Sequence, residues 1–368
     1  MRVILGIIIL CIYANQLFGQ FVAEEYYMFG KNKFDEGKYF EAVDFLDKAI
    51  KTDPNYTDAI FLRGQSFLAL KRYKLAIDDF TRIIDKRNSY DLNSAVYFLN
   101  RAIAWMEMKE YDFSEKDFKM ALKLKPDYPD TYYELARFKF ITYHDKNEAM
   151  KEINKAIKIN PNEPAYYCRR AEYKAALAKF HPNSKEIYES ALNDASIAIE
   201  MEPDNFNFYQ VRTMVNKEMG DPLEAVNDYN KMIEINPYGI EAYTERGIIK
   251  MQNDLYVSAI KDFTKSIELN TNNEQNYRYR ALCRHNILDF NGAYEDYSQS
   301  IDLLREQLNY SNGDEYDNVK RILADTYLKR GAAATSMGNS FNACADFRMA
   351  YDLGSNLGLN YLRKYCGI

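Results

Sequence analysis

Small and large apolar residues return along the chain in a fixed pattern, about every 34 residues. In eight of the nine copies a small residue is followed four positions later by a large apolar one, a place that Ala195 takes in the fifth copy, and three further on usually by a second small residue. Ser114, Phe118 and Ala121 show the pattern, which Pro126 then closes. Spacings of three and four residues place these side chains on one face of a helix. Because Pro interrupts a helix, each copy predicts one helix and then a break.

A second helical pattern precedes each of these helices. A large residue, usually aromatic, is followed four positions later by Gly, Ala or Thr. The pairs are Tyr26/Gly30, Ile60/Gly64, Phe98/Ala102, Tyr132/Ala136, Tyr167/Ala171, Tyr209/Thr213, Tyr243/Gly247, Tyr277/Ala281 and Tyr327/Gly331. The small residues let two helices approach closely, and the large ones fill the space beside them. Nine two-helix units in phase predict a solenoid, which grows by adding units to one stack.

These positions resemble the signature of the tetratricopeptide repeat over residues 23–356. The resemblance implies an all-α fold: a right-handed α-solenoid of about nine helix-turn-helix units, which we expect a C-terminal capping helix near 357–366 to close. It also implies a concave groove, lined mainly by the first helix of each unit, that binds peptides or protein partners.

Three departures from the repeat shape the predicted organisation. The fourth unit is one residue longer near His144, and the fifth has eight extra residues near 180–188. About sixteen extra residues at 308–323 predict an extended connection with a turn at 311–314. We therefore expect a leader at 1–20, units one to eight at 21–307, the connection at 308–323, and the ninth unit with its cap at 324–368.

The first twenty residues have the layout of a secretory signal peptide. Arg2 is followed by an apolar run at 3–13, and Gly19 offers a small residue at a cleavage position. The run is shorter than the roughly 20 apolar residues of a membrane span. We expect an exported protein, periplasmic or associated with the cell surface. An uncleaved anchor and lipidation at Cys11 are the less favoured alternatives.

Charge and composition exclude some kinds of partner. The 368 residues carry a formal net charge of −6, and no run of Lys and Arg stands out. Sequence-independent binding to nucleic acid requires such a basic surface, so we expect no nucleic-acid partner. Contact with a membrane is expected only through an uncleaved leader or a membrane-bound partner.

The residue types that carry catalysis are sparse. Three His are present, none four residues from another, and no Cys-x-x-Cys pair, glycine-rich phosphate loop or nucleophile motif occurs. We expect no enzyme activity, no cofactor and no metal site.

Arg and Asp recur together inside the repeat. Seven units carry Arg just before the small residue of the first helix and Asp just before the large residue of the second. The pairs are Arg63/Asp79, Arg101/Asp117, Arg170/Asp194, Arg212/Asp228, Arg246/Asp262, Arg280/Asp296 and Arg330/Asp346. The two units without the Arg also lack the Asp, so we predict an ion pair within a unit or to the next one. A ladder of Arg that binds phosphate or carboxylate ligands is the less favoured alternative.

The cysteines outside the leader fall into two groups. Cys344 and Cys366 lie on the last repeat helix and at the end of the expected cap, so they are either a disulfide or two buried thiols. Cys168 and Cys283 are far apart in the repeat, which predicts two buried free thiols.

The resemblance also indicates which residues face the groove. In the first four units they include Tyr27, Lys31, Phe34, Phe61, Leu68, Leu99, Ile103, Met106, Tyr133, Arg137 and Phe140, a mostly apolar set. In units six to eight they include Gln210, Lys217, Glu241, Thr244, Arg278 and His285, a polar set. We hypothesise that the apolar part holds a peptide segment or partner helix. The alternative is that these aromatic residues pack within the solenoid.

The sequence as a whole predicts a non-catalytic scaffold or adaptor of the cell envelope, which binds a protein or peptide in its groove. The alternative is an envelope receptor that binds a small molecule or glycan in the same groove, with Tyr rings as stacking platforms.

Overall fold

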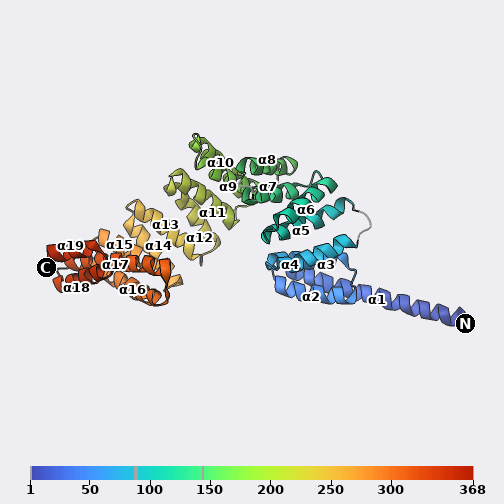
Figure 1. Cartoon of the computed structure of the whole chain (residues 1–368), viewed down its shortest axis with the longest axis horizontal. Coiled ribbons are helices and arrows are strands. Elements are labelled where there is room, and N and C mark those ends of the chain that lie inside the picture. Colours follow the sequence, from blue (N-terminus) through green and yellow to red (C-terminus); the bar gives the residue numbers. More distant parts are fainter. Residues whose placement is uncertain (1, 87–89, 143–144, 368) are drawn as a thin grey trace. The chain divides into compact units, whose positions relative to one another are not determined.

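A computed structural model describes residues 2–86, 90–142 and 145–367. This part of the chain is built from helices, without a β-strand (Figure 1). Contacts divide it into two compact halves, and the boundary between Tyr173 and Lys174 falls inside helix α9. We describe each half by itself. The one-residue difference predicted near His144 lies outside the described residues.

The N-terminal half holds four complete helix pairs and the start of a fifth. They are α1 (Arg2–Asp35), α2 (Tyr39–Thr52), α3 (Thr57–Ala69), α4 (Tyr73–Asp85), the 3₁₀ turn η1 (Leu92–Ser94), α5 (Ala95–Glu107), α6 (Tyr111–Leu124), α7 (Pro129–Thr142), α8 (Lys146–Ile159) and α9 (Pro164–Ala178).

The C-terminal half continues the same alternation and ends on a single helix. It contains α10 (Ser184–Met201), α11 (Phe206–Met219), the 3₁₀ turn η2 (Pro222–Glu224), α12 (Ala225–Ile235), α13 (Ile240–Gln252), α14 (Tyr256–Leu269), α15 (Glu274–Asn286), α16 (Phe290–Tyr310), α17 (Gly313–Ser336), α18 (Ser340–Asp352) and α19 (Asn356–Tyr365). Nine helix pairs with a terminal cap in the described chain confirm the predicted all-α solenoid.

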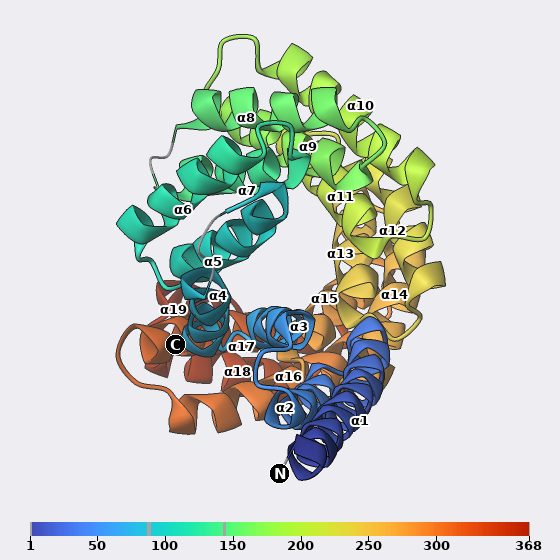
Figure 2. The ribbon, with the colours of Figure 1, turned by 90° about the vertical axis from the view of Figure 1, so that its right-hand side faces the viewer.

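The helices of the N-terminal half lie in two layers. In the N-terminal half the first helices of successive units contact one another, from α1 to α3, α3 to α5 and α5 to α7. Figure 2 shows α3, α5 and α7 along one side of this half, with α6 to the left of α5 and α8 above α7 in this view. The first helices therefore share a surface, as the resemblance implied for a groove.

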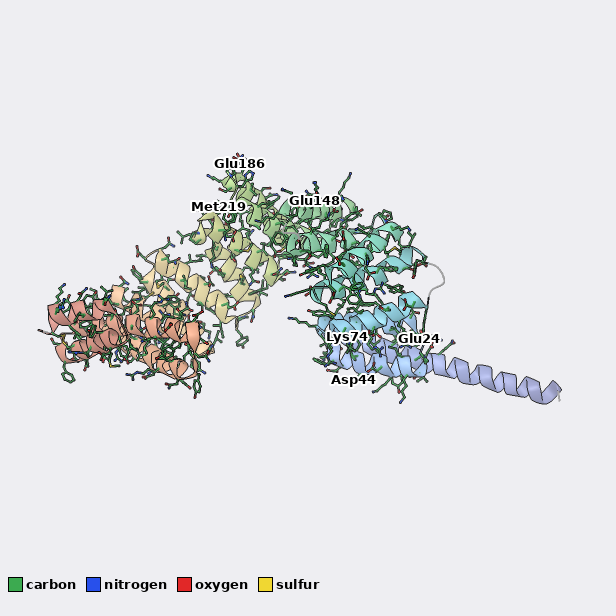
Figure 3. The ribbon with its side chains drawn as sticks, viewed as in Figure 1. Glu24, Asp44, Lys74, Glu148, Glu186 and Met219 are labelled. Carbon is green, nitrogen blue, oxygen red and sulfur yellow. A yellow bond between two sulfur atoms is a disulfide. The ribbon has the colours of Figure 1, made fainter. Side chains whose placement is uncertain are left out.

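The repeat positions form the core between the layers. In α4, Ala76, Ile77 and Phe80 are buried, while charged side chains such as Asp44 of α2 and Glu186 of α10 lie exposed at the surface (Figure 3). The small residue of the first helix is needed for this packing. A Cβ atom added to Gly64 would lie 2.6 Å from the Phe80 ring.

The prediction of an extended connection at 308–323 is wrong. The extra residues lengthen two helices, since α16 continues to Tyr310 and α17 already begins at Gly313. Only Ser311 and Asn312 lie outside both helices, within the turn predicted at 311–314. The physical reason is the apolar spacing of Val319 and Leu323, both of which are buried and hold the added turns of α17 against the core.

The fifth-unit insertion and the leader also take helical form. After a turn at 181–183, α10 spans 18 residues, and Tyr188 in its early part is buried. The leader residues after Met1 belong to α1, whose first part projects beyond the neighbouring helices of its half (Figure 1). None of the helices in the described residues is both long and apolar enough to cross a membrane.

Candidate partner-binding surfaces

The residues predicted to line the groove lie on the first helices of units one to four. Tyr27, Lys31 and Phe34 lie on α1, Phe61 and Leu68 on α3, Leu99, Ile103 and Met106 on α5, and Tyr133, Arg137 and Phe140 on α7. Because these four helices contact one another in order, the structure places the predicted residues in one helical layer.

Two of these residues cannot contact a partner directly. Leu99 is 3% exposed and Met106 is 4% exposed, and both belong to the hydrophobic core that also contains Phe118 and Phe138. Their inclusion in the predicted groove surface is therefore wrong.

The aromatic residues of the predicted groove are half-buried, and most pack across repeat units. The Phe61 ring lies 5.2 Å from Tyr97 of the next unit, and the Tyr133 ring 5.2 Å from Tyr166. The Phe140 ring stacks on Tyr173 at 4.6 Å. Packing within the solenoid, the alternative interpretation, thus takes up part of each ring, and the rest stays accessible to solvent. We call Tyr27, Phe34, Phe61, Tyr133 and Phe140 the aromatic row.

Charged groups flank the later part of the aromatic row. Arg137 donates to Glu107 at 2.5 Å and to Glu134 at 2.8 Å. Burial opposes the charge of this guanidinium, but the two carboxylates raise the pKa of Arg137 above its ordinary value. Burial also raises the pKa of the Tyr133 hydroxyl, which accepts a hydrogen bond from Arg169 at 3.3 Å. These groups are fixed by one another, so a partner would meet an ordered polar rim.

In the fifth unit the structure pairs Asp194 with Lys174 at 2.6 Å. Six of the seven predicted Arg–Asp pairs are documented as two-pronged ion pairs. In each, Arg Nε and Nη2 donate to the two carboxylate oxygens at 2.5–3.1 Å. The pairs are Arg63–Asp79, Arg101–Asp117, Arg246–Asp262, Arg280–Asp296 and Arg330–Asp346, and Arg212–Asp228 has the same geometry. The six carboxylates are 3–5% exposed. They join the first helix of a unit to its own second helix.

A third hydrogen bond from each Arg, which sequence reasoning missed, reaches the preceding unit. Arg Nη1 donates at 2.5–3.1 Å to a polar residue of an earlier second helix. The acceptors are Asp47, Thr81, Asn154, Ser196, Asn230, Thr264 and Ser298. The available signal was a polar residue two positions after the carboxylate site in every unit that precedes an Arg. Lys119 holds that position before unit four, which has Leu135 in place of Arg.

Several units add a second cation to the buried carboxylate, also from the first helix. Lys250 donates to Asp262 at 2.8 Å, and Arg284 to Asp296 at 2.9 Å. In unit four, Lys139 occupies the same place and pairs with Glu152 at 2.7 Å, so it replaces the missing Arg. Unit one replaces the pair by apolar contact between the Phe29 and Phe45 rings at 5.6 Å.

Burial sets the electrostatics of the pairs. Desolvation raises the pKa of Asp79, Asp117 and Asp346, and the hydrogen bonds and charge of the partner Arg offset this only in part. A buried pair of this kind loses solvation on both sides, so its main contribution is to geometry rather than to net stability. Because their donors are engaged inside the solenoid, these Arg residues do not form a free ladder for anionic ligands.

The cap is covalently tied to the last repeat. Cys344 of α18 and Cys366, which follows α19, form a disulfide with their Cα atoms 5.8 Å apart. Cys168 and Cys283 are buried free thiols, and burial raises the pKa of each to about 12. Both thiols are therefore protonated at neutral pH.

The polar set predicted in units six to eight does not form one surface. Gln210, Lys217 and Glu241 line a cavity of about 490 Å³. Thr244 instead lies against Ser266, with the two hydroxyls 2.8 Å apart, and His285 packs edge-on against Phe290. Arg278 lines a separate cavity of about 640 Å³ beneath the cap, whose other walls the sequence reasoning did not foresee.

The described residues contain no cluster of three or more His, Cys, Asp and Glu that could hold a metal ion.

The architecture and its surfaces define a helical-repeat protein of the solenoid class. Residues 23–56 and 58–89 each match a family model described as a tetratricopeptide repeat. The chain thus carries tetratricopeptide repeats in this segment. Proteins with this repeat are generally protein-interaction scaffolds, and they are typically non-catalytic adaptors.

Individual relatives are similar over part of their length. The chain is 30% identical over 148 residues to the small glutamine-rich tetratricopeptide repeat-containing protein 2 of Saccharomyces cerevisiae, covering 40% of each chain. A solved tetratricopeptide repeat protein from Parabacteroides merdae is 19% identical, with a TM-score of 0.45 over 71% of this chain and 98% of that one. Part of another repeat protein, from Cytophaga hutchinsonii, is 17% identical, with a TM-score of 0.46 over 69% and 98%. The chain thus spans less than half of the yeast protein.

Proposed function

We propose that this chain is a non-catalytic scaffold that binds a protein or peptide segment through the aromatic row of its N-terminal half. The observation that carries the proposal is the partial exposure of Phe61, Tyr133 and Phe140 on helices that share one layer. Aromatic side chains anchor protein interfaces because they bury much apolar area at a low cost in conformational entropy.

The packing of these rings favours a protein partner. Their contacts with Tyr97, Tyr166 and Tyr173 fix them before a partner arrives, so little ordering accompanies binding. The fixed ion pairs of Arg137 beside them supply a polar rim. An apolar centre with a polar rim is the usual anatomy of a protein interface.

We propose further that the protein acts after export, in the periplasm or at the cell surface. The leader layout at 1–20 and the disulfide between Cys344 and Cys366 support this location, because disulfides persist in oxidising compartments. N-terminal sequencing of protein recovered from a cell envelope tests the leader. A mature chain that starts at or near Gln20 is expected, and a chain that retains residues 1–19 would contradict cleavage.

The test of partner binding is a crosslinking pull-down of the tagged, full-length protein from its own cell envelope. The variant Phe61→Glu/Tyr133→Glu places charges in the aromatic row. Phe40→Glu/Phe113→Glu is the matched control, since both residues are aromatic and exposed but lie on the second helices. Circular dichroism and thermal unfolding of each variant show whether the fold is kept.

The proposal expects a discrete protein that is recovered with the unmodified chain and the control but lost with the aromatic-row variant. Equal recovery by a folded aromatic-row variant would move the binding surface elsewhere. A failure to enrich any protein would oppose the scaffold function and favour the alternative, a receptor for a small molecule or glycan.

A further inference from the structure

A cavity in the C-terminal half lies beneath the cap. It has a volume of about 640 Å³ and is lined by α15, by α17, and by the turn between α18 and the capping helix α19. Arg278 contributes from α15, Lys320 and Arg321 from α17, and Leu353 and Leu357 from the cap side. We call it the cap cavity. Its volume is within the roughly 300–1,000 Å³ of small-ligand and peptide side-chain sites.

The cap cavity exists because of the sixteen extra residues of the chain. Asp317, Lys320, Arg321 and Ile322 all come from the segment that lengthens α17 beyond an ordinary repeat helix. A unit of standard length would leave this wall out. The cavity is therefore a feature of this chain rather than of its repeat, and it lies in the half of the chain that does not carry the aromatic row.

Positively charged hydrogen-bond donors outnumber the carboxylate acceptors in the wall of the cap cavity. Arg278 uses Nε and Nη2 to hold Glu274, which leaves its Nη1 group available. Arg321 donates to the uncharged Asn318, and within the described chain neither Arg321 nor Lys320 has an ion pair. Of the two acidic residues in the wall, Asp325 is already neutralised by Lys329 at 2.8 Å. Asp317 is the other acidic residue of the wall and has no ion pair among the described residues, so two cations stand against one carboxylate and the local excess of charge is positive.

Apolar surface lies directly beside these cations. Leu353 and Ile322 are half-buried, and Leu357 is 55% exposed at the start of α19. The disulfide between Cys344 and Cys366 holds α19, and with it Leu357, against the last repeat. A free inorganic anion would use the cations but leave the leucine side chains in water. A ligand that satisfies both walls carries a carboxylate next to an apolar side chain.

We infer that the cap cavity binds an acidic peptide segment in which an apolar residue neighbours Asp or Glu. The carboxylate contacts Lys320, Arg321 and the free side of Arg278, and the apolar side chain covers Leu353 and Leu357. This second site differs in chemistry from the aromatic row and does not depend on it. A chain that carries both sites therefore has two binding sites of different chemistry, one in each half.

The experiment measures binding of fluorescein-labelled nonapeptide libraries to the full-length, oxidised protein by fluorescence anisotropy. In one library each position is Asp, Glu, Leu, Ile or Gly, and in the matched library Asn and Gln replace the two acids. The site variant is Lys320→Ala/Arg321→Ala. The control variant, Arg348→Ala/Arg363→Ala, removes the same charge from exposed residues outside the cavity. Phe61→Glu/Tyr133→Glu serves as a second control.

The acidic library should bind at least about tenfold more tightly than the amide library, and the preference should weaken at high salt. The site variant should lose the preference, while both controls keep it. Equal binding of the two libraries, or an undiminished preference in the folded site variant, overturns the proposal. If only inorganic phosphate binds, with a saturable rise in the unfolding temperature that Lys320→Ala/Arg321→Ala removes, the cavity is a small-anion site and the peptide proposal is wrong.

Discussion

Removal of the Asp262 carboxylate should destabilise the solenoid more than most single substitutions. Asp262 is 4% exposed and accepts hydrogen bonds from Arg246 Nε, Arg246 Nη2 and Lys250 Nζ at 2.5–3.1 Å. In Asp262→Ala two cations remain in a partly buried site without a counter-charge. The loss of one partner of a buried pair costs about 3–5 kcal/mol, and the cost here should lie in the upper part of that range because two cations are affected.

The assay is urea unfolding followed by circular dichroism, together with amide hydrogen exchange in α13 and α14. Exchange is informative because a repeat array can open locally, and a loss of 3 kcal/mol lowers protection by about a hundredfold. Glu268→Ala is the matched control. It breaks the exposed Lys265–Glu268 pair at 3.1 Å and should cost about 0–1 kcal/mol. The reasoning is refuted if Asp262→Ala changes the free energy of unfolding no more than the control does.

Three further predictions concern the cap and the half-buried His285. Reduction of the disulfide, or Cys366→Ser, should lower the free energy of unfolding by about 3 kcal/mol, because the disulfide limits the entropy of a loop of about 22 residues in the unfolded chain. Identical thermal unfolding curves of the oxidised and reduced protein would contradict this. Gly358→Ala should lower the free energy of unfolding by about 1–3 kcal/mol, because the added Cβ would lie 2.6 Å from the Tyr351 backbone nitrogen. Faster amide hydrogen exchange in α19 would show that the cap is loosened. Unchanged exchange would show that the cap adapts to the added methyl group and would contradict the prediction. Burial lowers the pKa of His285, so its contribution to stability is complete above the ordinary pKa of about 6.5 and is lost as the pH falls through the lower value of the folded state. The urea midpoint should therefore fall on acidification more in the unmodified protein than in His285→Phe, and parallel pH profiles would rule this out.

The fold could be predicted because one pattern is repeated nine times. All copies except the fifth, which has Ala171 and Ala195, place a small residue opposite a large one, and the structure shows why that choice is restricted. A Cβ atom on Gly247 would approach the Phe263 ring to 2.8 Å, as at Gly64 and Phe80. The Arg–Asp pairs were predictable for a related reason: two positions that change together within one chain are held by a contact.

The extra residues at 308–323 were harder to interpret, because no second copy exists for comparison. The turn signal at 311–314 was read correctly, but its Gly and Asp begin α17 rather than extend a loop. The cap cavity follows from this helix and could not be foreseen without it. The prediction that Leu99 and Met106 face the groove was wrong for a different reason. Groove positions come from the average geometry of a repeat, whereas burial depends on the size of the neighbouring side chains.

The same hydrogen-bonded network explains where this chain has room for binding. In six units the Arg donates to three acceptor atoms on the second helices of two adjacent units, as Arg63 does to Asp79 and Asp47, so polar contacts that no ligand needs to complete hold the second helices together. The first helices are therefore not the sole support of the stack, and their aromatic side chains can remain partly exposed. Unit four shows what happens where the repeat lacks this Arg. Leu135 replaces the Arg, Lys139 takes over the buried Glu152, and Arg137 is released to the groove side, where it orders Glu107 and Glu134 beside Tyr133. The departure from the repeat thus places a charged rim next to the aromatic row, at the point where the proposed partner would bind.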